Sequence, residues 1–445
     1  MTHNINVNKS LIFIIDLALF VCSFYIAFLI RYGYPFPEYN LSAFMAMLPW
    51  FLLVFVVLCF VYNIYSEYAK FDDTLVSLLC IVILTTLVSL ALSYILYQFA
   101  VPRLLIALSA FLQMVLLGTW RYIVWRSALL ILQPKRAIII GYSSEIKKIL
   151  QSINISLARS LRIEKEIRLN GKDNFAGRWE ELIIGPRMKN VDLIIICSSV
   201  GQENRKLILN YCIQTSKMVM IVPDIYDVML QRARLVSAGD IPIIQLQGLL
   251  APTPMGYFKR GFDIIMSLLG MIILLPLGFL IMLIIKIDSR GPVIYSQERL
   301  GLAGKKFMVY KFRTMVTDAE KDTGPIMASA VDPRITRVGR LLRRTRLDEI
   351  PQLWNVFTGS MSLVGPRPER PYFVEKYCKD LPEFQHRHYV KGGITGLAQV
   401  EGRYSTDPDK KLVYDLLYAQ NNNLLMDLVI LLRTIKVSMQ REKSS

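Results

Sequence analysis

Residues 332–356 read DPRITRVGRLLRRTRLDEIPQLWNV and join a basic segment to an acidic pair, Asp348 and Glu349. Arginines recur every three to four residues before that pair, at positions 334, 337, 340, 343 and 344, with apolar residues between them. A helix with this spacing carries a stripe of guanidinium groups beside an apolar stripe. Such a helix suits a membrane interface in which the arginines meet phosphate groups. A solvated cationic face is the alternative.

The acidic pair is the strongest candidate for chemistry. Carboxylates surrounded by cations are expected to have a depressed pKa and to stay ionised. An ionised aspartate can attack phosphorus to give an acyl phosphate if arginines and a divalent cation screen the repulsion between anions. Consecutive helical residues point about 100° apart, so one of Asp348 and Glu349 could attack while the other binds the metal. A helix cap or a salt bridge is the alternative for an isolated pair.

Further motifs lie after the acidic pair. Residues 359–368, GSMSLVGPRP, predict a rigid loop that presents Arg367, whose planar fork can donate two parallel hydrogen bonds to a phosphate. Residues 392–400, GGITGLAQV, predict a flexible turn that enters a strand. Residues 424–439 have the helical spacing of an amphipathic helix resting on a membrane. The region therefore reads as a mainly helical unit for phosphoryl transfer.

Composition separates this chain from ordinary soluble proteins. It has 445 residues, of which 53% are hydrophobic and 20% charged, so membrane segments joined to soluble parts are expected. The net charge of +17 suits anionic lipid or phosphorylated substrates, and by itself would also suit nucleic acid. The six cysteines are scattered without a CxxC pair, so neither a disulfide framework nor a zinc site is expected.

Four apolar stretches come first, and each is long enough to cross a hydrocarbon core that needs about 20 residues. They are residues 11–30, 44–65, 75–97 and 104–131. The first shows no small-residue cleavage site, so it reads as a retained anchor. Basic residues cluster at the end of the fourth stretch, whereas the loop at 31–41 carries only Arg31 against Glu38, and this bias places both chain ends in the cytoplasm. Asp16 is either a buried polar contact or a carboxylate near the headgroups.

Residues 135–250 read as a soluble module. Residues 137–140 and 193–197 are short apolar strands with helical patterns between them, which predicts a small parallel α/β unit. The first strand ends in GYSSE at 141–145, with one glycine where a dinucleotide fingerprint needs GxGxxG. A structural or regulatory Rossmann-like module is therefore favoured over a nucleotide site.

A fifth apolar stretch, residues 264–285, contains Pro276. Lys259 and Arg260 precede it and Lys286 and Arg290 come after it, as expected of a segment that enters and leaves by the cytoplasmic face. Proline removes a helical hydrogen bond, so a break there would turn the helix back as a re-entrant hairpin. A kinked spanning helix is the alternative, and it would put the rest of the chain outside the cell.

The motifs KFRTM, DPRITRVGRLLRRTRLDEIPQLWNV, MSLVGPRPE and GITGLAQVEGR together resemble the bacterial sugar transferases, which are monotopic phosphoglycosyl transferases of the polyprenol-phosphate hexose-1-phosphate class. The resemblance covers about residues 259–436. It implies transfer of a sugar 1-phosphate, with glucose or galactose as the expected sugar, from a UDP-sugar to undecaprenyl phosphate with release of UMP. It also implies a role at the start of exopolysaccharide, capsule or O-antigen synthesis.

The resemblance assigns roles to residues. It implies that Asp348 is the nucleophile that forms a phosphosugar-enzyme intermediate and that Glu349 is its partner, which holds Mg2+. Phosphate or nucleotide contacts are expected from the basic residues of the motifs, which are Lys311, Arg313, Arg334, Arg346 and Arg367. The family's re-entrant helix commonly breaks at Ser-Pro, whereas the break here would be at Leu275-Pro276.

The predicted fold has three parts: a four-helix transmembrane domain at 1–133, a Rossmann-like α/β module at 134–252, and a mainly α catalytic domain at 253–445. The last contains a re-entrant helix at 262–286 and interfacial amphipathic helices. We expect a multi-pass protein of the bacterial inner membrane with its catalytic domain on the cytoplasmic face. Its partners would be the two substrates and membrane lipids but no nucleic acid, and a homodimer is left open.

Two other functions are open to this sequence. A membrane-anchored nucleotide-sugar dehydratase or epimerase is one, because Tyr372 and Lys376 give Y-x-x-x-K, although the glycine fingerprint is missing upstream. A non-catalytic scaffold for polysaccharide assembly is the other. His386 and His388 could ligate a metal, but a basic surface loop is the favoured interpretation.

Overall fold

The computed structural model describes residues 9–66, 70–96, 101–131, 134–156, 161–169, 191–231, 233–238, 241–245, 255–317, 319, 324, 332–402 and 407–440. The chain divides into two compact units, Met1–Pro223 and Asp224–Ser445. The four expected apolar stretches and the α/β module begin the chain, and a mainly helical part ends it. The domain boundaries expected at 133/134 and 252/253 stay predictions.

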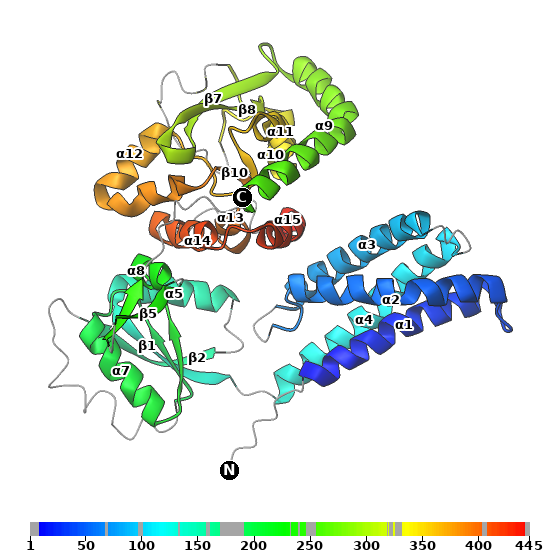
Figure 1. Ribbon diagram of the computed structural model, residues 1–445, viewed down its shortest axis with the longest axis horizontal. Helices are drawn as coiled ribbons and strands as arrows, with labels where there is room; N and C mark the ends of the chain where they lie inside the picture. Colours follow the sequence, from blue (N-terminus) through cyan, green and yellow to red (C-terminus); the bar gives the residue numbers. More distant parts are fainter. Residues whose placement is uncertain are drawn as a thin grey trace. The chain divides into compact units, whose positions relative to one another are not determined.

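Four long apolar helices form the first part of the chain. They are α1 (Lys9–Tyr32), α2 (Glu38–Val61), α3 (Phe71–Ile95) and α4 (Arg103–Ile131). Each is long and apolar enough to cross a membrane. Helix α4 packs against α1 and α3, and α3 packs against α2 (Figure 1). Stacked phenylalanines join α1 to α2, with 4.4 Å between the ring centroids of Phe20 and Phe55. The chain is therefore a membrane protein.

A buried ion pair lies inside this helical part. The carboxylate of Asp16 on α1 pairs with the guanidinium of Arg121 on α4, and the Tyr65 hydroxyl donates to it at 2.9 Å. Asp16 and Arg121 are both buried. Of the two interpretations of Asp16, the buried polar contact is confirmed, and a cation on the neighbouring helix compensates the charge. Arg121, one of the basic residues at the end of the fourth apolar stretch, is thus the partner of Asp16.

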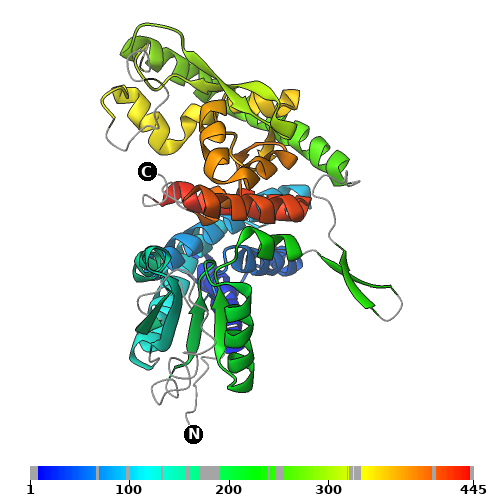
Figure 2. The same cartoon turned by 90° about the vertical axis from the view of Figure 1, so that its left-hand side faces the viewer.

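The α/β module contains a parallel sheet with strand order β2-β1-β3-β4, as the sequence predicts. Its strands are β1 (Lys135–Tyr142), β2 (Leu161–Leu169), β3 (Leu193–Ile196) and β4 (Met218–Ile221). Helices α5 (Ser143–Ser156) and α7 (Gln202–Gln214) cover opposite faces (Figure 2). Ile139 of β1 packs in a cluster with α5, and Ile138 packs in one with α7. Burial on both faces explains why the central strands β1 and β3 contain uninterrupted apolar runs, at 137–140 and 193–196.

The carboxyl ends of β1 and β3 meet where the strand order reverses, which is the usual ligand position in such sheets. There, the Glu145 carboxylate accepts hydrogen bonds from the Ser198 and Ser199 amides at 3.0 and 3.2 Å. A Cβ at Gly141 would lie 2.4 Å from Cys197 Cβ, so the single glycine allows close packing between strands. These contacts favour the structural interpretation of the module over nucleotide binding.

The second unit is mainly helical with short two-stranded sheets. It begins with α8 (Ile225–Leu230) and the hairpin β5 (Arg234–Ala238) and β6 (Ile241–Gln245), which Figure 2 shows as a separate ribbon. Next come α9 (Met255–Asp288), β7 (Ile294–Leu300), η3 (Leu302–Gly304), β8 (Lys306–Phe312), α10 (Arg337–Thr345), η4 (Leu347–Glu349), α11 (Gln352–Thr358) and β9 (Ser362–Val364). The chain continues with α12 (Pro371–Asp380), η5 (Pro382–Tyr389), β10 (Gly393–Thr395), α13 (Leu397–Glu401), α14 (Pro408–Gln420) and α15 (Leu424–Met439).

Helix α9 is continuous, contains Pro276, and changes direction along its length (Figure 1). Its first half packs into the core of the unit through Phe262, and its second half does so through Ile281 and Ile285. Between and beside these contacts it exposes a row of large apolar side chains, namely Ile265, Leu268, Leu269, Ile272, Ile273, Leu275, Phe279, Leu280 and Leu283. The helix therefore has one face on the folded unit and one exposed apolar face.

The two basic residues expected before the apolar stretch lie in the first turns of α9 and have structural partners. Lys259 Nζ lies 2.6 Å from an Asp427 carboxylate oxygen, and Arg260 donates to the Val356 carbonyl at 2.6 Å and to the Phe357 carbonyl at 2.7 Å. These bonds tie α9 to α11 and α15, and the expectation that the two residues also flank a membrane face stays a prediction.

Candidate active site

The acidic pair lies on a tight turn between two helices. Helix α10 starts at the Thr336 cap and ends at Arg346, whose φ of +56° is in the left-handed region. This backbone conformation costs roughly 1–2 kcal/mol for a residue with a side chain. It reverses the chain so that Asp348 and Glu349 lie on the short turn η4, and each is only 8% exposed. The turn thus carries both carboxylates into the interior of the unit.

Two cations hold the Glu349 carboxylate. Lys311 Nζ at the end of β8 donates to Oε1 at 2.8 Å, and Arg367 Nη2 from the loop after β9 donates to the same oxygen at 2.5 Å. Burial would raise the pKa of Glu349, but Arg367 and Lys311 outweigh it and hold that pKa well below its usual range. Burial lowers the pKa of Lys311. The expected ionised state is therefore correct for Glu349.

Asp348 differs from its neighbour. Within the described part of the chain, no residue donates a hydrogen bond to its carboxylate. Burial and the adjacent Glu349 carboxylate raise the pKa of Asp348. The expectation of a depressed pKa for both carboxylates is therefore wrong for Asp348, because burial and the Glu349 charge outweigh the cations Lys311 and Arg367. The pair thus consists of one carboxylate held by two cations and one that accepts no hydrogen bond from the described residues.

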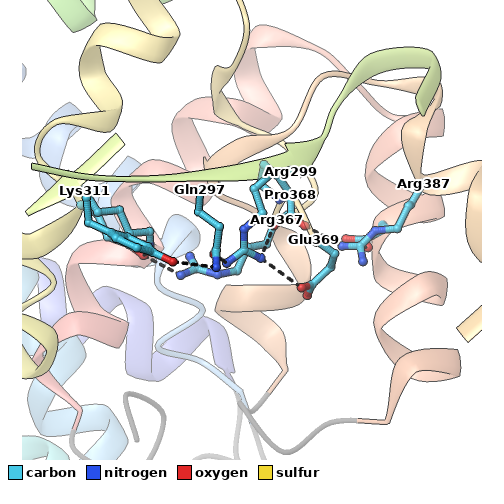
Figure 3. Close-up of polar contacts among 10 residues, drawn as sticks. Gln297, Arg299, Lys311, Arg367, Pro368, Glu369 and Arg387 are labelled. Carbon is cyan, nitrogen blue, oxygen red and sulfur yellow. Dashed lines mark hydrogen bonds and ion pairs between the residues drawn. The ribbon is translucent and has the colours of Figure 1, made fainter. Parts of the chain in front are cut away.

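The loop that presents Arg367 is fixed from both sides. The Gly365 amide donates to the Thr395 carbonyl at 2.8 Å, so the loop lies against β10. A Cβ at Gly365 would be 2.2 Å from the Lys391 carbonyl oxygen, which excludes a side chain. On the other side, Arg387 Nη2 donates to the Arg367 carbonyl at 2.9 Å (Figure 3). The rigid loop expected from the sequence therefore has specific anchors.

Two of the predicted phosphate contacts have other partners. Arg313 donates to the Ser289 carbonyl at 2.7 Å and to the Arg290 carbonyl at 3.0 Å, just after the end of α9. Arg334 precedes α10 instead of joining its stripe, and it pairs with both oxygens of Asp332 at 2.9 and 2.7 Å. These guanidinium groups are therefore engaged in local structure, and their contact with a substrate stays a prediction.

Arg346 is a different case. It directly precedes the acidic turn, and no hydrogen bond joins its guanidinium to any other described residue. Burial and the nearby Arg367 lower the pKa of Arg346. Among the predicted contacts, Lys311, Arg346, Arg367 and the acidic pair are thus brought together around η4.

Sequence reasoning missed several supporting residues. Asn355 of α11 accepts from the Tyr310 amide at 3.1 Å and donates to the Met308 carbonyl at 2.7 Å, which fixes β8 just before Lys311. Arg387 was expected on a basic surface loop, but it and His388 are buried, so that expectation is wrong. Burial and Arg387 lower the pKa of His388 to about 4. The consecutive polar residues His386, Arg387 and His388 gave no signal of burial.

The donor set bears on metal binding. No cluster of three or more metal-ligating side chains occurs among the described residues. Both cations bond to Oε1 of Glu349, which leaves its Oε2 and the Asp348 carboxylate available. Mg2+ in phosphoryl-transfer sites commonly takes one or two carboxylates and completes its shell with substrate phosphate and water. The residues present therefore fit such an ion.

The second unit of the chain is similar in sequence to a known family. The sequence model of the family described as "Bacterial sugar transferase" matches residues 255–441. The chain is 39% identical over 193 residues to a UDP-N-acetylgalactosamine-undecaprenyl-phosphate N-acetylgalactosaminephosphotransferase of Aeromonas hydrophila, covering 42% of this chain and 45% of that protein. It is 37% identical over 271 residues to a UDP-glucose:undecaprenyl-phosphate glucose-1-phosphate transferase of Klebsiella pneumoniae, covering 59% and 57%.

A shorter relative is covered almost completely. The exopolysaccharide production protein PSS of Rhizobium leguminosarum bv. phaseoli is 42% identical over 193 residues, which is 42% of this chain and 96% of that protein. By contrast, the chain spans about half the length of the Aeromonas and Klebsiella relatives.

Proposed function

Because this chain belongs to the bacterial sugar transferase family, we propose that it transfers a hexose 1-phosphate from a UDP-sugar to undecaprenyl phosphate and releases UMP. The observation that carries the proposal is the unequal pair on η4, with Glu349 clamped by two cations beside an unclamped Asp348. UDP-glucose or UDP-galactose is the preferred donor. The Aeromonas relative is named for N-acetylgalactosamine, so that sugar belongs in any substrate panel.

The reaction proceeds in two displacements at one phosphorus. The Asp348 carboxylate attacks the phosphorus that bears the sugar, and the bond from that phosphorus to the UMP oxygen breaks. The resulting acyl phosphate carries the sugar 1-phosphate. An oxygen of undecaprenyl phosphate then attacks the same phosphorus and the bond to Asp348 breaks, which restores the carboxylate. The bond between the sugar's C1 and its oxygen survives both steps.

The other residues divide the electrostatic work. Glu349 would hold Mg2+, which supplies charge neutralisation at the phosphates. Lys311 and Arg367 fix Glu349 and leave further N–H groups to meet phosphate oxygens. Arg346 has a guanidinium without a hydrogen-bond partner among the described residues, so it is the best candidate to contact the departing nucleotide phosphate.

The lipid substrate requires that the site lie at the membrane, and α9 supplies the support for this. A straight helix of 34 residues would be about 50 Å long, whereas the hydrocarbon core is about 30 Å thick. Both halves of α9 nevertheless pack on the same folded unit. We therefore place α9 as a re-entrant hairpin bent at Pro276. The exposed apolar residues Leu341 of α10, Trp354 of α11 and Leu425 of α15 would rest in the interface.

We place the catalytic part on the cytoplasmic face of the inner membrane, where UDP-sugars are available. The product, undecaprenyl diphosphate carrying one sugar, suits the first membrane step of exopolysaccharide, capsule or O-antigen synthesis. A homodimer is left open.

The test uses purified membranes containing the full chain and a panel of UDP-sugars, with UMP release measured with and without undecaprenyl phosphate. Enzyme and UDP-sugar alone should give one equivalent of UMP and a label trapped on Asp348. Label that appears only with the lipid present would replace the two-step mechanism by direct displacement. UMP release that persists in Asp348→Ala would contradict the role of this residue, and a polysaccharide scaffold would release no UMP at all.

A further inference from the structure

The buried side of the loop that carries Arg367 contains a second ion pair. Arg387 of η5 and Asp415 of α14 are almost fully buried, with 2.9 Å between Arg387 Nη2 and Asp415 Oδ2. The same Nη2 donates to the Arg367 backbone carbonyl at 2.9 Å. One nitrogen of Arg387 thus lies between the carboxylate of α14 and the peptide bond that precedes Pro368.

Stability alone does not explain such a pair. Removing two charges from water costs several kcal/mol, and apolar residues of similar volume in place of a buried pair are often neutral or stabilising. Apolar residues in place of this pair would have apolar neighbours, because Leu412 and Leu416 of the same helix pack with Phe384 of η5 in one hydrophobic cluster. The charge on Arg387 does, however, give a directed, charge-assisted donor to the loop carbonyl.

The position of the loop carbonyl determines where the Arg367 side chain starts. That side chain reaches Glu349 at 2.5 Å, whereas the main chain of Arg367 is held by Arg387. On the next peptide, Arg299 Nη1 donates to the Pro368 carbonyl at 3.1 Å. Reaction rates are sensitive to such positioning, and a displacement of about 1 Å can cost a hundredfold.

We propose that Arg387 and Asp415 are a positioning pair that sets the backbone of Arg367 and thereby aims its guanidinium at Glu349 and the substrate phosphates. Asp415 orients Arg387, and Arg387 fixes the loop. Neither touches the reacting atoms. The inference rests on the proposed function, since it gives Arg367 its catalytic context.

The experiment replaces the pair by apolar residues of similar size in the full-length chain, as the double variant Arg387→Met/Asp415→Leu. Because no buried charge is left unpaired, this variant should melt close to the wild-type temperature. Its kcat/KM for UMP release should nevertheless fall roughly ten- to a hundredfold. Leu416→Val is the matched control, because it changes the same helix and core without touching the loop, and its kcat/KM should stay within about threefold of wild type.

A cycle with Arg367→Gln separates positioning from general damage. If the pair acts through Arg367, adding Arg387→Met/Asp415→Leu to Arg367→Gln should cause little further loss. The inference would be overturned if the losses in kcat/KM from the pair variant and from Arg367→Gln multiply. It would also be overturned by a pair variant with wild-type kcat/KM, or by an equal loss in Leu416→Val. If the double variant does not fold, Arg387→Lys takes its place, because it keeps a cation without the planar fork. Adding Arg387→Lys to Arg367→Gln should likewise cause little further loss.

Hydrogen exchange provides a readout independent of turnover. The amides of Gly365, Arg367, Glu369 and Arg370 should exchange faster in the pair variant than in wild type and in Leu416→Val. Unchanged exchange would overturn the positioning role even if activity falls. If the wild-type chain releases no UMP from any UDP-sugar, the proposed function fails, whereas the exchange result still decides the role of the pair.

Discussion

Lys311 Nζ lies 2.8 Å from Glu349 Oε1, on the oxygen that Arg367 also contacts. The contact joins the end of β8 to the acidic turn η4 and leaves the second oxygen of Glu349 without either cation. Lys311 therefore acts as a counterion and also orients the Glu349 carboxylate, so that Oε2 is the oxygen left for other ligands.

Lys311→Met should remove this constraint. We expect UMP release to fall at least tenfold and the free energy of unfolding to drop by about 1–3 kcal/mol, because a buried charged group loses a hydrogen-bond partner. Lys306→Met is the matched control on the same strand, since Lys306 pairs with Glu298 at the surface. That variant should stay within about 0.5 kcal/mol of wild type in thermal unfolding. Equal losses in the two variants would contradict the role given to Lys311.

The pH dependence of UMP release should report the ionisation of Asp348. Burial and Glu349 raise the pKa of Asp348, so its carboxylate takes up a proton at a higher pH than an ordinary aspartate does. The attack needs the ionised form, so kcat/KM should fall as the pH is lowered, with a midpoint above the usual aspartate value of about 4. Glu349→Gln removes the neighbouring negative charge, so the midpoint of its residual activity should move to lower pH. An unchanged midpoint in Glu349→Gln would show that another group controls the fall of kcat/KM at low pH.

Much of the fold could be predicted from the sequence because membrane helices and buried parallel strands have strong local signals. The amphipathic helix expected at 424–439 is α15, with the same bounds. The strand expected within 392–400 is only partly correct, since β10 ends at Thr395 and residues 397–401 form α13. Short apolar runs do not distinguish a strand from one helical turn.

Some residues of the site could likewise be predicted from the sequence, and others could not. Asp348, Glu349 and Arg367 stand in dense motifs, and their meeting results from rigid local structure. The partners of Arg313 and Arg387 could not be read from the chain, because both depend on contacts with carbonyl groups from distant segments. Asp415 lies in a helix with no neighbouring motif, and its burial arises only when η5 packs on α14.

The topology of α9 can be tested by cysteine labelling in intact cells, in a chain whose native cysteines are replaced. Lys305→Cys is exposed on the turn after β7, so a re-entrant α9 predicts no reaction with an impermeant thiol reagent until the cells are opened. Tyr34→Cys, in the exposed loop between α1 and α2, is the control and should react in intact cells. Pro276→Leu restores a helical hydrogen bond, so it should increase labelling of Lys305→Cys. Labelling of Lys305→Cys in the parent chain would indicate a spanning helix.

The Asp16–Arg121 pair should stabilise the first four helices only as a pair. Asp16→Leu or Arg121→Leu alone leaves a buried charge and should cost about 3–5 kcal/mol, whereas the double variant should lose much less. Tyr65→Phe removes one hydrogen bond to Asp16 and should cost about 1 kcal/mol. Thermal unfolding in detergent measures all four. Additive losses in the double variant would mean that the two charges are stabilised separately.

Arg346 offers a test in which stability and activity move in opposite directions. Its φ of +56° is strained for any residue with a Cβ, so Arg346→Gly should raise the free energy of unfolding by roughly 1 kcal/mol. The same change removes a guanidinium that has no hydrogen-bond partner among the described residues, so kcat/KM for the UDP-sugar should fall at least tenfold. Ala303 has a φ of +55° on an exposed turn, so Ala303→Gly should give a similar gain in stability with unchanged kinetics. Melting curves and initial rates of UMP release measure the two effects, and an Arg346→Gly chain that is more stable and fully active would remove Arg346 from the site.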